Sequence, residues 1–162
     1  MGGMTAHANH VGMTNPRLRQ GRHSQVGQVY ALTTVAYRRQ PLFTHPDNVE
    51  QIIGALRFIE AERITCSLAW VVMPDHLHWL MQLRQRTLPA CMQLFKSRSA
   101  RLLNRALSRS GPIWQPGFYD HAVRSDESLH AQALYIVANP VRAGLATHLG
   151  EYPYAWCRWP LG

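Results

Sequence analysis

Two apolar segments of the sequence, 63–73 and 76–83, are separated by only two residues, Pro74 and Asp75. Each segment has the length and the composition that are typical of a buried strand. Parallel strands need a long crossover connection, so two strands joined by two residues have to pair antiparallel as a hairpin. The chain is therefore expected to fold around an antiparallel sheet.

The hydrophobic pattern predicts further elements on both sides of this hairpin. Strands are expected at 25–37 and 118–124, and helices at 46–62, 87–107 and 126–139. This order predicts the α+β class, with a ferredoxin-like split βαβ fold that has an antiparallel sheet and helices on one face. Residues 1–23 have no hydrophobic period, so they are expected to form a mobile basic leader before a single domain at 24–162.

The composition is strongly basic, because 17 Lys and Arg residues oppose nine Asp and Glu residues, and all of the cations except Lys96 are arginine. The forked guanidinium of arginine suits phosphate groups, which favours a polyanionic partner. An arginine-rich genome would give the same excess of arginine, so composition alone does not decide between these two explanations. The three cysteines form no paired motif, and no segment is long and apolar enough for a membrane span. We therefore expect a cytoplasmic protein with no membrane partner.

His76 and His78 occupy alternate positions of the predicted strand 76–83. Side chains at i and i+2 leave a strand from the same face, so both imidazoles can converge on one divalent cation such as Mg²⁺, Mn²⁺ or Zn²⁺. Leu77 and Trp79 would then face the core from the other side. The alternative is a pair of surface histidines on the polar face of an amphipathic strand.

Tyr135 lies on the last predicted helix, away from its apolar stripe, and Asn139 follows one turn later. A tyrosine beside a metal-bound phosphodiester can act as a nucleophile. The side-chain carbonyl of Asn139 could complete the shell of such a metal ion. The alternative is a half-buried tyrosine, with Asn139 as an ordinary helix C-cap.

The helix predicted at 87–107 carries a row of cations, and no Asp or Glu occurs between Thr87 and Pro112. A solvated helix face usually alternates its charges, so a row of one sign is a candidate track for a nucleic-acid backbone. The row consists of Arg98, Arg101, Arg105 and Arg109, with Lys96 nearby.

Three segments resemble the single-tyrosine HUH transposase superfamily, and specifically its REP-associated tyrosine transposase branch. They are WVVMPDHLHWLM (70–81), GPIWQPGFYDHAVR (111–124) and LYIVANPVRAGL (134–145), and the resemblance covers roughly residues 22–159. In one departure from the family pattern, Asp75 stands where the family commonly has Asn.

The resemblance implies an enzyme that cuts and rejoins single-stranded DNA beside a hairpin such as a REP-like palindrome. It implies that His76, His78 and Asn139 hold Mg²⁺ or Mn²⁺, and that Tyr135 forms a 5′-phosphotyrosine link and leaves a free 3′-hydroxyl. It also implies that Arg142 helps to bind DNA, and that a monomer acts with its own tyrosine, although a dimer stays open. The alternative is a catalytically silent module that binds hairpin DNA or structured RNA.

Overall fold

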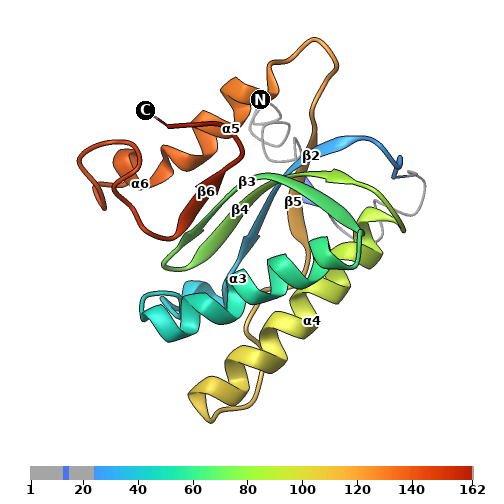
Figure 1. The fold of residues 1–162 in the computed structure, drawn as a ribbon. Helices are drawn as coiled ribbons and strands as arrows, with labels where there is room; N and C mark the ends of the chain where they lie inside the picture. The colour runs from blue at the N-terminus through green and yellow to red at the C-terminus, as the bar shows by residue number, and fades with distance from the viewer. Residues whose placement is uncertain (1–12, 15–23, 162) are drawn as a thin grey trace, which may run out of the picture.

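The computed structural model describes residues 13–14 and 24–161, which form one sheet covered by helices (Figure 1). All strand pairs are antiparallel, and the strand order is β1-β5-β2-β4-β3-β6. The strands are β1 (Met13–Thr14), β2 (Val29–Val35), β3 (Thr65–Met73), β4 (His76–Leu83), β5 (Phe118–Ala122) and β6 (Ala155–Cys157). The hairpin predicted from the two-residue connection is the β3–β4 pair.

Two long helices, α3 (Pro46–Ala61) and α4 (Leu88–Leu107), pack on one face of the sheet (Figure 1). Each begins as the sequence predicts, because Pro46 fits the first turn of α3 and the Thr87 side chain accepts a hydrogen bond from the amide of Ala90 at 3.2 Å. The apolar residues of α3 recur at spacings of three and four, so they form one buried face.

A shorter helix, α5 (Leu129–Val137), lies on the opposite face of the sheet and is followed by α6 (Asn139–Arg142). The predicted α+β class and its antiparallel sheet are confirmed. The prediction that the helices lie on one face holds for α3 and α4, and it is wrong for α5. Periodicity shows which side of a helix is apolar, but it does not show which face of a sheet that side covers.

The side-chain alternation of β4 determines which core each of its residues enters. Trp79 is fully buried in the core beneath α3 and α4. Leu80 points the other way and is buried in a second core with Ile136 of α5. His76 and His78 have the same parity as Leu80, so they lie on the α5 face of the sheet.

Two short strands were not predicted. β6 pairs with β3 at one edge of the sheet, and β1 pairs with β5 near the other. Segments of two or three residues are too short to show a period in the sequence. Apart from β1, the leader predicted at 1–23 lies outside the described residues.

The last predicted helix is shorter than the range 126–139. It begins at Leu129 because Ser128 is its N-cap, with the Ser128 hydroxyl accepting from the amide of Ala131 at 3.1 Å. No helix in the described part of the chain is long and apolar enough to cross a membrane.

Candidate active site

The imidazoles of His76 and His78 point at each other on β4. Their Nε2 atoms lie 3.1 Å apart, and the two rings are nearly perpendicular, at 87°. Two nitrogens bound to one ion at about 2.1 Å, with a right angle between the bonds, would be about 3 Å apart. The i, i+2 spacing thus brings the two Nε2 atoms together, at a separation that would suit two ligands of one divalent cation.

The other nitrogen of each ring is held by a neighbouring side chain. Asp75 Oδ1 lies 2.7 Å from Nδ1 of His76, and Thr33 Oγ1 lies 2.9 Å from Nδ1 of His78. Asp75 Oδ2 also accepts a hydrogen bond from Arg39 Nη1 at 3.2 Å. Contacts of this kind fix the orientation of a metal-binding imidazole. Here they hold the two Nε2 atoms facing each other.

The charges around the pair favour neutral imidazole and ionised carboxylate. The pKa of His78 is lowered to about 4, first by burial and then by the positive charges of His76 and Arg142. Burial raises the pKa of the Asp75 carboxyl, but its contacts with His76 and Arg39 lower that pKa further, and the net result is below the usual value. At neutral pH His78 therefore keeps the lone pair that a metal ligand needs.

Tyr135 is presented to solvent by α5. Its side chain is 65% exposed, whereas Ala133 and Ile136 on the same helix are buried against the sheet. Tyr135 therefore faces away from the apolar stripe, as predicted. The Arg142 guanidinium stacks 4.0 Å from the centre of its ring, and Nη2 donates to the Tyr135 carbonyl at 2.7 Å. The positive charge of Arg142 also contributes to the lowered pKa of His78.

Asn139 does not continue the helix of Tyr135. α5 ends at Val137, and Asn139 is the first residue of α6. Its Nδ2 donates to the carbonyl of Ile136 at 2.8 Å, which leaves Oδ1 on the other side of the amide. The described residues contain no group of three His, Cys, Asp or Glu side chains that could hold a metal ion, so a third protein ligand would have to be of another type, such as an amide oxygen.

The predicted row of arginines on α4 is only partly formed. Arg101 and Arg105 are exposed, but Arg98 stacks 3.5 Å from the ring centre of Phe58 on α3. Arg109 lies beyond the helix, which ends at Leu107. The row also lies on the face of the sheet opposite the histidines, because α4 packs on that face. It does not border the candidate active site.

Lys96 lies on nearly the opposite side of α4 from Arg98, since two residues of a helix span more than half a turn. Its Nζ donates to the carbonyls of Gln115 and Gly117, at 2.8 and 2.7 Å. Burial lowers its pKa to about 8. The ammonium of Lys96 thus binds the segment before β5 and does not lie beside the arginines. Its role in DNA binding stays a prediction.

Two residues of the site were not predicted. Thr33 comes from β2, 45 residues before His78 in the sequence, and sits opposite it in the sheet. Arg39 comes from the 3₁₀ turn Tyr37–Arg39, 36 residues before Asp75. Neither residue belongs to a local motif. The pairing of β2 with β4 places Thr33 beside His78, and it places the turn that follows β2 so that Arg39 contacts Asp75.

Comparisons with known proteins show the family of the chain. The family model described as IS200-like transposase matches residues 24–139. The REP-associated tyrosine transposase of Escherichia coli K12 is 33% identical over 89 residues, which cover 54% of this chain and 51% of that protein. A Haemophilus influenzae protein, named as a candidate of the same kind, is 30% identical over 115 residues, covering 60% of this chain and 65% of that protein. The aligned regions thus span about half to two thirds of these relatives.

A solved structure of a REP-associated tyrosine transposase bound to a REP hairpin has the same fold. It superposes with a TM-score of 0.69 at 25% sequence identity, covering 83% of this chain and 79% of the other. The family match includes both histidines and Tyr135. The chain therefore belongs to the IS200-like transposase family, and it resembles the REP-associated tyrosine transposases within that family.

Proposed function

We propose that this protein is a metal-dependent nuclease and strand transferase that cleaves single-stranded DNA beside a hairpin, with Tyr135 as its nucleophile. The observation that carries the proposal is the pair of facing Nε2 atoms on the sheet face that α5 covers, with Tyr135 exposed on that helix. Hairpin DNA is the proposed substrate because the solved relative is bound to a REP hairpin. Membership of a transposase family supports a DNA-cutting role over binding alone.

His76, His78 and the amide oxygen of Asn139 would hold a divalent ion, Mg²⁺ or Mn²⁺. When bound, such an ion withdraws negative charge from a phosphate and makes its phosphorus more electrophilic. Asp75 and Thr33 keep the two rings in place for this role, through their contacts with the Nδ1 atoms.

Tyr135 would lose its phenolic proton, and its oxygen would form a bond to phosphorus as the bond from phosphorus to the 3′-oxygen breaks. The products are a 5′-phosphotyrosine and a free 3′-hydroxyl. Arg142, stacked on the tyrosine ring, would hold the ring and offset the negative charge of the phosphate. Attack by a 3′-hydroxyl on the phosphotyrosine reverses the step, so rejoining needs no energy cofactor.

The proposal is tested with Tyr135→Phe, which removes only the phenolic oxygen. Wild-type protein incubated with hairpin DNA and Mg²⁺ or Mn²⁺ is expected to give a covalent protein–DNA species on a denaturing gel. Tyr135→Phe should give no such species while it still binds the hairpin. Tyr154→Phe, on the C-terminal segment, is the matched control and should form the adduct normally. Adducts in Tyr135→Phe would exclude this nucleophile, and hairpin binding by the wild type without an adduct would favour a silent binding module.

A further inference from the structure

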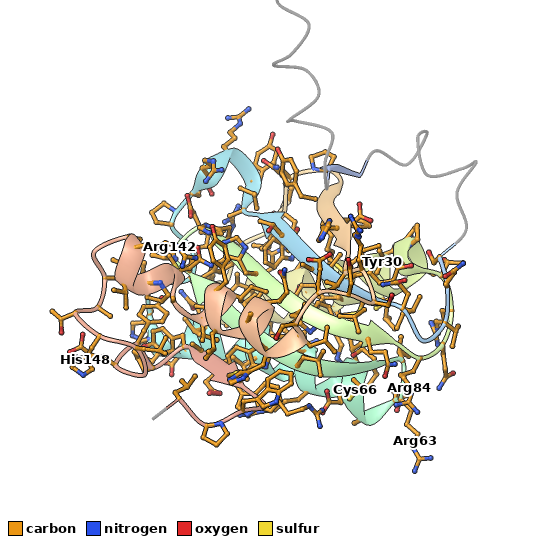
Figure 2. The ribbon with its side chains drawn as sticks, turned by 90° about the horizontal axis from the view of Figure 1, so that it is seen from above. Tyr30, Arg63, Cys66, Arg84, Arg142 and His148 are labelled. Carbon is orange, nitrogen blue, oxygen red and sulfur yellow. The ribbon has the colours of Figure 1, made fainter. Side chains whose placement is uncertain are left out.

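A second polar site lies at the far end of the β3–β4 hairpin. A surface pocket of about 470 Å³ is formed where α3 ends, β3 begins and β4 ends. We call it the basic pocket, and its lining residues are Glu60, Arg63, Thr65, Cys66, Arg84 and Gln85. Figure 2 shows Arg63, Arg84 and Cys66 at one end of the molecule, and Arg142 of the candidate active site at the other.

The two arginines of the basic pocket have no acidic partner. Within the described part of the chain, no carboxylate lies within ion-pair distance of Arg63 or Arg84. The lining contains one carboxylate, Glu60, whose Oε1 accepts from the amide of Ser67 at 2.6 Å. Two free guanidinium groups at one pocket are suited to a phosphate, which each of them can bind through two parallel hydrogen bonds.

One residue that lines the basic pocket, Thr65, has a buried hydroxyl without a partner in the part of the chain that the structure describes. Thr65 is 2% exposed, and its Oγ1 has no hydrogen-bond partner among the described residues. Buried hydroxyls are nearly always hydrogen-bonded, because leaving one unpaired costs about 1–3 kcal/mol.

The backbone of the basic pocket holds Arg63 in a conformation that favours glycine. Arg63 follows the end of α3 and has a φ of 60°. Its amide donates to the carbonyl of Glu60 at 2.9 Å, and the amide of Ile64 donates to the carbonyl of Ile59 at 3.2 Å. This helix ending usually carries glycine, and a side chain there costs about 1–2 kcal/mol. An arginine that is kept at a strained backbone position, beside a second unpaired arginine, indicates a binding role for its side chain.

The basic pocket and the histidines lie at opposite ends of one strand. From His76 to Arg84, eight residues of extended chain at about 3.3 Å each span about 26 Å. B-form DNA rises about 3.4 Å per base pair, so a duplex needs about eight base pairs to cover this distance. A hairpin stem of that length, cleaved beside Tyr135, is long enough to reach the pocket.

We propose that the basic pocket binds a backbone phosphate of the hairpin stem, distant from the scissile phosphate. This inference rests on the proposed function for its ligand, DNA, but not on the covalent chemistry. It predicts a contact that adds affinity without base specificity, because phosphates carry no sequence information. Hairpins whose stems are too short to span β4 would not make this phosphate contact.

The test is the double variant Arg63→Gln/Arg84→Gln, with binding followed by fluorescence anisotropy at several salt concentrations. With a hairpin stem of about 12 base pairs, the slope of log affinity against log salt concentration should decrease by the equivalent of about one to two phosphate contacts. The affinity at low salt should fall by roughly tenfold. With a stem of about four base pairs, the variant and the wild type should bind equally. Adduct formation at saturating DNA should be unchanged, because the pocket is far from Tyr135.

The matched control is Arg57→Gln/Arg124→Gln, which removes the same charge outside the pocket and should leave the salt dependence close to that of the wild type. Arg84→Gln alone keeps the helix ending of Arg63 intact and should give about half of the loss in salt dependence. The inference is overturned if the double variant keeps the salt dependence of the wild type, or if it loses the same affinity with the long and the short stem. Adduct formation tests the proposed function separately. If inorganic phosphate raises the melting temperature of the wild type only, and DNA binding is unaffected, the pocket binds a free anion instead.

Discussion

Asp75 joins an arginine to a histidine at the candidate active site. One of its oxygens contacts Nδ1 of His76 at 2.7 Å, and the other accepts from Arg39 at 3.2 Å. The carboxylate therefore cannot turn freely, and neither can the imidazole that it contacts. At the scale of single residues, these outer contacts orient the imidazole that is proposed to bind the metal ion.

Asp75→Ala should weaken Mn²⁺ binding by roughly 10- to 100-fold, because His76 loses the contact that orients its ring. Asp75→Asn should lose much less, since the amide oxygen can still accept from Nδ1. Titration of Mn²⁺, followed by the electron paramagnetic resonance signal of the free ion, measures both affinities. Asp126→Ala, at an exposed pair with Arg124, is the control. Equal affinities for Asp75→Ala and the wild type would show that Asp75 only shapes the turn.

At the scale of elements, the ends of α4 follow from local sequence, but its surroundings do not. Thr87 and the apolar period define where the helix begins and which side is buried. The neighbours of Lys96 come from the segment 115–117, which the helix period cannot place. For this reason an apparent row of cations separates into exposed arginines, an arginine stacked on Phe58 and a lysine bound to backbone carbonyls.

Lys96→Met should lower the free energy of unfolding by about 1–3 kcal/mol, because the carbonyls of Gln115 and Gly117 lose a charged donor. The salt dependence of hairpin binding should not change, since the ammonium is directed at the protein. Urea unfolding measures the first quantity and anisotropy titrations the second. Gln93→Met, at an exposed position of the same helix, is the control and should be close to neutral. A weaker salt dependence in Lys96→Met would restore this lysine as a phosphate contact.

Only the part of the candidate site that local patterns define can be predicted from the sequence. The placement of His76, His78 and Tyr135 is predictable because each occupies a defined position in a predicted strand or helix. The exposure of Tyr135 follows from the period of α5. Thr33 and Arg39 are not found, because the register between β2 and β4 is set by the packing of the whole sheet.

At the scale of the whole molecule, the sheet separates two kinds of surface. One face is covered by α3 and α4 and forms the larger core, and the other is covered by α5 (Figure 1). The histidines lie on the α5 face, and Tyr135 is exposed on α5. A single chain thus presents the two histidines that are proposed as metal ligands and the proposed nucleophile on one face. This arrangement predicts that each molecule uses its own tyrosine, and that a monomer is sufficient for cleavage.

Mixing two inactive variants tests this prediction. His76→Ala lacks a metal ligand and Tyr135→Phe lacks the nucleophile, so each alone should give no adduct. If every active site is built within one chain, an equimolar mixture should stay inactive, because no molecule has both groups. If tyrosine helices are exchanged between two chains, a mixed dimer regains one complete site and adducts appear. Adduct formation by the mixture, absent from either variant alone, would therefore contradict action within one chain, and sedimentation of the wild type with hairpin DNA would show the dimer responsible.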